Sequence, residues 1–198
     1  MKLARLFTIA AIMLASWSSL VIAQERWRRL PPERDAHFYA PRNRLEEFEA
    51  RQSTLLIKGR TWVATLRTQS GSARVEATEI RDADDSSRAT GVTVTLITSN
   101  PAAEVRCLID YDEIDPLVSA FDAMAKAGDA VTKLGHFELH YRTRTDFEII
   151  VFKQLSGGIA AAIEGGFIDR ARLLLTLEEF TKLRWMIVQA KEKLDAIK

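Results

Sequence analysis

The chain has 198 residues, 47% of them hydrophobic and 28% charged, and its 28 basic and 27 acidic side chains give a formal net charge of +1. This length is sufficient for one sizeable domain. The near-neutral balance gives no support for a nucleic acid or an anionic membrane as the partner. Cys107 is the single cysteine, so no internal disulfide can form and the hydrophobic core has to hold the fold.

The first 23 residues have the features of a cleavable export signal. Lys2 and Arg5 precede an apolar run without charges over residues 6–23. Its small and β-branched ending predicts cleavage between Ala23 and Gln24, with export to the periplasm or beyond the cell. An uncleaved anchor, which would be the chain's only link to a membrane, is the alternative, because the run is about long enough to span a bilayer. Cleavage would remove two of the 28 basic residues, leaving 26 against 27 acidic ones.

Residues 24–52 form an Arg/Pro-rich arm that shows no apolar period up to about residue 41. We interpret it as an extended segment, either a plain linker or an arm that binds a partner. Its candidate partner-binding residues are Trp27, Arg28 and Arg29. Leu45 and Phe48, three positions apart among charged side chains, predict a short helix within residues 42–52.

Residues 53–198 are expected to form a single α+β domain with two similar halves, residues 53–127 and 128–198. In the first half, four segments have strand-like composition and are separated by turn residues. These segments are Thr61–Thr68, Ala73–Asp82, Gly91–Thr98 and Val105–Ile109. Apolar residues at helical spacing then predict an amphipathic helix over residues 111–126.

The second half repeats this order. Its expected strands are His136–Arg144, Asp146–Gln154, Gly158–Glu164 and Ala171–Leu175. The second of these is apolar on both faces, which is typical of a central strand. From residue 177 to the chain end, apolar side chains recur at intervals of three and four, which predicts a long amphipathic helix. They are Phe180, Leu183, Ile187, Ala190, Leu194 and Ile197.

The two strand-to-helix junctions align without a gap. In each, an N-cap residue is followed three positions later by glutamate, Asp110 with Glu113 and Thr176 with Glu179. Both pairs have the pattern of a capping box, in which each side chain accepts a backbone N–H left free at the helix start. We therefore predict two ββββα repeats that share one core.

Two consecutive units of four strands and a helix resemble the plan of the Whirly and Pur nucleic-acid-binding proteins over residues 61–198. The resemblance implies nucleic-acid binding, but no shared residue motif accompanies it. The export signal and the slightly acidic mature charge argue against nucleic acid, which requires a basic surface. We therefore expect no nucleic-acid partner.

One pattern points to a metal. His136, Glu138 and His140 alternate along an expected strand, so their side chains point to the same face. Two imidazoles and a carboxylate can hold Zn²⁺ with one position open for water. The alternative is the polar, solvent-facing side of a half-buried strand.

Trp185 is the candidate for partner binding in the body of the chain. At 100° per residue it lies opposite the apolar stripe of the last helix. A large aromatic side chain on a polar face contacts either the other half of the protein or a partner.

The functional prediction follows from these patterns. Cys107 is expected to face the core, no glycine pair precedes a helix as a phosphate-binding loop must, and no credible nucleophile and base occur together. We predict no cofactor and a non-enzymatic exported protein that binds a protein partner or self-associates. The alternatives are a metal-binding protein or metal-dependent hydrolase that uses His136, Glu138 and His140, and a carrier of a small ligand between the sheets.

Overall fold

The structure is a computed structural model that describes residues 40–128 and 130–197. The predicted signal at residues 1–23 and the candidate arm residues Trp27, Arg28 and Arg29 lie outside the described residues. From Pro41 onward the described residues form one compact unit. No helix within these two ranges is long and apolar enough to cross a membrane.

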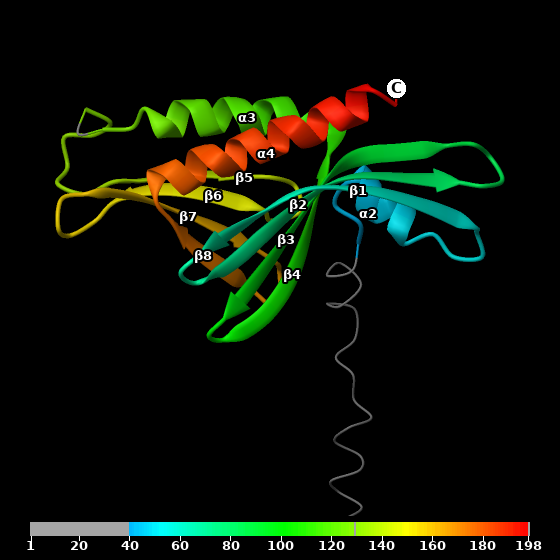
Figure 1. Ribbon diagram of the computed structural model, residues 1–198, viewed down its shortest axis with the longest axis horizontal. Helices are drawn as coiled ribbons and strands as arrows, with labels where there is room; N and C mark the ends of the chain where they lie inside the picture. Colours follow the sequence, from blue (N-terminus) through cyan, green and yellow to red (C-terminus); the bar gives the residue numbers. More distant parts are fainter. Residues whose placement is uncertain (1–39, 129, 198) are drawn as a thin grey trace, which may run out of the picture. The chain divides into compact units, whose positions relative to one another are not determined.

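This unit contains two antiparallel four-stranded sheets (Figure 1). Sheet A has the order β1 (Leu56–Thr68), β2 (Gly71–Asp82), β3 (Arg88–Ser99) and β4 (Ala102–Asp110). Sheet B has the order β5 (Glu138–Arg142), β6 (Glu148–Lys153), β7 (Ile159–Gly165) and β8 (Ala171–Leu175). The helices are α2 (Arg44–Glu49), α3 (Tyr111–Ala125) and α4 (Leu177–Asp195). The predicted α+β class is confirmed, with a helix after the second sheet.

The strands differ from the expected segments mainly in length. β1 begins five residues before Thr61, and its early residues pair with the end of β2, from Leu56 opposite Asp82 to Arg60 opposite Thr78. This part of β1 is exposed on both faces, so it shows no alternation of apolar and polar residues. In sheet B the strands are shorter, because residues 143–147 form the turn between β5 and β6.

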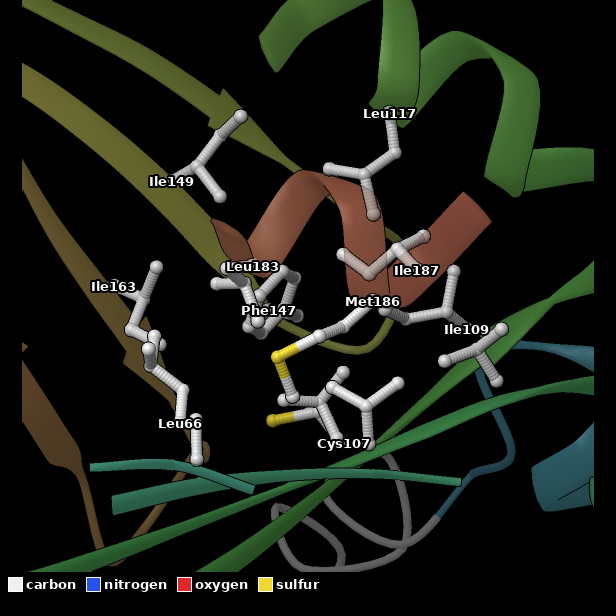
Figure 2. Packing of buried hydrophobic residues seen from close by; sticks show 14 of the residues in the cluster. Leu66, Cys107, Ile109, Leu117, Phe147, Ile149, Ile163, Leu183, Met186 and Ile187 are labelled. Atoms are coloured by element: carbon white, nitrogen blue, oxygen red, sulfur yellow. The ribbon is translucent and has the colours of Figure 1, made fainter. Parts of the chain in front are cut away.

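One hydrophobic core lies between the inner faces of both sheets and the helices α3 and α4 (Figure 1). Figure 2 shows Cys107 and Ile109 of β4 facing Met186 and Ile187 of α4, with Ile149 of β6 in the same cluster. The apolar side chains of α4 that are buried are Phe180, Leu183, Met186, Ile187, Ala190 and Leu194. The predicted core position of Cys107 is confirmed, since its exposed fraction is 1%.

Both predicted helix caps are present. The capping box of α3 joins Asp110 and Glu113, and that of α4 joins Thr176 and Glu179. The apolar segment predicted to be a central strand is β6, which pairs with β5 on one side and β7 on the other.

Helix α2, grouped with the arm in the sequence analysis, packs against the outer face of sheet A. Leu45 and Phe48 are buried there with Ile80, Ala89 and Leu108. The carboxylate of Asp110 also accepts the backbone N–H groups of Arg44 at 2.7 Å and Leu45 at 3.0 Å. Asp110 therefore ties the start of α2 to the junction between β4 and α3.

Candidate interaction surface

Two of the four outer strands have edge groups that other segments cover. At β8, the backbone N–H of Leu174 donates to Oγ of Ser70 at 3.1 Å, from the β1–β2 turn. At β4, the carbonyl of Leu108 accepts Nδ2 of Asn43 at 2.7 Å and Oγ1 of Thr145 at 2.6 Å. Edge groups satisfied in this way are not available to another chain.

The outer edge of β1 is different. β1 has 13 residues and pairs only with β2. Residues 57–62 are all exposed, and across the described ranges no hydrogen bond reaches their outward backbone groups. We call residues 57–62 the β1 edge. A β-bulge between Trp62 and Ala64 ends this regular segment, and a bulge bends and twists the strand that follows.

Trp62 is the largest side chain of the β1 edge. It stays 61% exposed, and its indole N–H donates to Oγ1 of Thr65 at 3.4 Å. Sequence reasoning placed Trp62 in a strand but did not single it out. A signal was present, because Arg60, Thr61 and Thr65 around it are polar, which is unusual for a core tryptophan.

The β1 edge is basic. Lys58, Arg60 and Trp62 share the outer face of sheet A, because alternate residues of a strand point to the same side. Lys58 forms an ion pair with Glu49 of α2 at 3.1 Å. Arg60 has no ion pair within the part of the chain that the structure describes, so its guanidinium is available to a partner.

Trp185 lies on the element next to this strand. α4 packs along β1 and β2 (Figure 1), and the indole of Trp185 is 53% exposed. The prediction that this residue points away from the buried stripe of its helix is confirmed. The structure thus places an exposed tryptophan on each of two adjacent elements, Trp62 on the outer face of sheet A and Trp185 on a helix that packs against the inner face.

The three residues predicted to bind a metal are not gathered into one site. His136 is exposed and precedes β5, whereas Glu138 and His140 are on β5 with Oε2 and Nε2 3.1 Å apart. Among the described residues, no group of three or more His, Cys, Asp or Glu side chains is arranged to hold a metal ion. To bind a metal, His136 would have to move towards His140, and a carboxylate would have to leave the His140 ring. The metal site stays a prediction.

His140 is instead part of a charged cluster with Glu148 of β6. Nδ1 of His140 lies 2.9 Å from Oε1 of Glu148, whose other oxygen accepts Arg142 at 2.8 Å. The hydrogen bond to Glu148 raises the pKa of His140. Burial opposes ionisation of Glu148, but the hydrogen bonds from His140 and Arg142 outweigh it and lower the pKa of this carboxyl. The cluster joins β5 to β6.

Cys107 does not have the environment of a nucleophile. Burial raises the pKa of its thiol to about 12, so the reactive thiolate is scarce at neutral pH.

An open cleft of about 930 Å³ lies at the β1–β2 turn, outside the core. Its lining includes Ser70, Phe152, Leu174 and Leu177, together with Glu179 of α4. Glu179 is the one ionisable side chain in this lining, and its carboxylate already accepts the backbone N–H of Thr176 at 2.7 Å. A single carboxylate engaged in a helix cap does not provide an acid–base pair for catalysis.

Comparisons of the chain with protein-family models, with curated proteins and with solved structures found no match. The function is therefore inferred from the residues of this chain alone.

Proposed function

We propose that the protein is a non-enzymatic exported protein that binds a macromolecular partner through the surface of β1 and α4. The observation that carries the proposal is the pair of half-exposed tryptophans, Trp62 at 61% and Trp185 at 53%, on two elements that pack together. Tryptophan is enriched among the residues that dominate binding energy at protein interfaces. A protein partner or a second copy of the chain is the proposed occupant, and no nucleic acid is expected.

Export is part of the proposal. It is supported by the basic start and the apolar run at residues 1–23. The single cysteine excludes an internal disulfide, and the described body is stabilised instead by the core between the sheets and the helices and by the smaller cluster under α2.

We also infer that the body consists of two ββββα repeats. The order of strands is the same in both sheets, and each sheet passes into its helix through a capping box. On this proposal, α3 and α4 are equivalent elements. Trp185 is then specific to the second repeat, because Ser119 and not an aromatic residue occupies the aligned position of α3.

Site-specific photo-crosslinking tests partner binding. The full-length protein is produced in its native envelope with p-benzoylphenylalanine in place of Trp185, Trp62 or Lys133. Lys133 is the control, because it is exposed and lies in the loop between α3 and β5, away from β1 in Figure 1. We expect one discrete adduct from positions 185 and 62 and none from position 133. Adducts from none of the three, with a protein that sediments as a monomer, would refute the proposal.

A further inference from the structure

We infer that the β1 edge accepts an extended, acidic segment of a partner protein as an added β-strand. This inference rests on the proposed function and names the chemistry of the partner. Three features support it: free backbone groups, alternating side chains and the positive charge of Arg60, which has no ion pair among the described residues.

The backbone of β1 offers the hydrogen-bonding groups of an unpaired strand. Peptides that add to a sheet edge gain affinity from main-chain hydrogen bonds and specificity from alternate side chains. One edge group of β4, the carbonyl of Leu108, is engaged by Asn43 and Thr145, and one edge group of β8, the N–H of Leu174, is engaged by Ser70. β5 is also an outer strand but has only five residues, whereas β1 has 13. A long, exposed edge strand is the usual site for pairing with another chain.

The two faces of the β1 edge specify different side chains in the partner. Lys58, Arg60 and Trp62 lie on one face, and Ile57, Gly59 and Thr61 lie on the other. Opposite charges that face each other across a strand pair stabilise it, as do aromatic and β-branched pairs. The matching segment therefore alternates carboxylates, which face Lys58 and Arg60, with small or β-branched apolar residues.

A second copy of β1 fits this edge poorly. In an antiparallel pair of two β1 strands centred on Gly59, Lys58 of each copy would face Arg60 of the other. Like charges directly opposite each other destabilise a strand pair. In this register the β1 edge therefore favours an acidic partner over self-association.

Two synthetic peptides test the inference with the full mature chain. The first is acetyl-Thr-Glu-Val-Glu-Val-Glu-Thr-amide, and the second has lysine at each glutamate. We expect the acidic peptide to bind and to slow amide hydrogen exchange at residues 57–62. It should also change the fluorescence of the W27F/W185F variant, in which Trp62 is the single tryptophan of the mature chain. The lysine peptide should do none of these.

Charge variants give the second readout. Arg60→Glu should weaken binding of the acidic peptide about five- to tenfold, because it replaces an attraction with a repulsion. Arg60→Lys should retain most of the affinity. Lys133→Glu is the matched control, since it makes the same kind of charge change far from β1, and it should leave binding unchanged.

The results that would overturn the inference are distinct from those that would overturn partner binding. An acidic peptide that fails to bind, or that protects amides elsewhere, overturns strand addition, while a crosslinked adduct at position 185 would still uphold partner binding. Dimerisation that protects residues 57–62 would assign the edge to a second copy. Binding of oligothymidylate that depends on Arg60, with no peptide binding, would assign it to nucleic acid.

Discussion

The sulfur of Cys107 in β4 lies 2.4 Å from the position that a Cβ on Gly165 in β7 would occupy. The two sheets therefore approach each other closely at a position where one strand has no side chain. Leu96 of β3 is the next neighbour, with Cδ1 at 3.1 Å from the same point. Glycine at 165 is required by packing, and not by an unusual backbone angle.

Gly165→Ala is expected to destabilise the protein by about 1–3 kcal/mol, the usual cost of overpacking a core. Urea denaturation measures this cost. Gly135→Ala is the control, because a Cβ there would have no neighbour within 4 Å, and it should change stability little. The double variant with Cys107→Ala should recover part of the loss, since it removes the overlapping sulfur. Equal stability of both single variants would contradict the packing account.

The Cys107 thiol is expected to be inert in the folded protein. Its sulfur is buried and its pKa is raised to about 12. A reagent therefore does not reach the sulfur, and little of the thiol is in the reactive thiolate form. A chromogenic disulfide reagent should label no thiol in native buffer at pH 8 and one thiol per chain in denaturant. Rapid stoichiometric labelling of the native protein would show that the contact between the sheets opens readily.

The two capping glutamates are expected to differ in their contribution to stability. Glu113 accepts the N–H of Asp110 at 3.3 Å and the backbone N–H of Arg144 at 2.8 Å, and its side chain is 10% exposed. Among residues 40–128 and 130–197, Glu179 accepts only the N–H of Thr176, at 2.7 Å. Glu113 therefore caps α3 and also links the first half of the chain to the β5–β6 turn. Glu113→Ala leaves the second backbone donor, the N–H of Arg144, without its partner.

We therefore expect Glu113→Ala to cost about 2–3 kcal/mol and Glu179→Ala about 1 kcal/mol. Urea denaturation of the two variants gives the comparison directly. Equal costs would mean that the bond to Arg144 contributes nothing beyond the cap.

The long helices and their caps were predictable because their signals are local. In α4 the apolar residues from Phe180 to Leu194 repeat with the period of one turn, and Thr176 and Glu179 are three positions apart. Strand composition was equally local, and it was enough to predict two groups of four strands. Each of these features is determined within a few residues of chain.

The β1 edge was not predictable because its character depends on pairing. Residues 57–60 show no alternation, since both faces are exposed, and only the register with β2 reveals them as strand. Whether Trp62 is exposed to solvent depends on which strand is outermost, and the order of strands is a property of the whole sheet. The cluster of His140 with Glu148 likewise depends on the register of β5 and β6, which residue spacing within β5 alone does not determine.

The stability of the protein is expected to depend on pH through His140 and Glu148. His140 has a raised pKa because of its hydrogen bond to Glu148, so its contribution to stability is fully present below about pH 6.5, the ordinary value, and is lost as pH rises through the raised one. The pKa of Glu148 is lowered, so its contribution is present above about pH 4.3 and is lost as pH falls through the lowered value. The charged cluster therefore contributes most to the stability of the fold between about pH 4.3 and about pH 6.5.

His140→Gln should accordingly cost more stability at about pH 5.5 than at about pH 9. The difference should stay under about 1 kcal/mol, because the His140 side chain is 44% exposed and solvent screens the pair. His136→Gln makes the same chemical change at an exposed position outside this cluster, and it controls for the loss of an imidazole. Urea denaturation at both pH values measures the effect. An equal cost for His140→Gln at the two values would mean that the imidazole is not charged in the folded protein at pH 5.5, and that the contact with Glu148 is a neutral hydrogen bond.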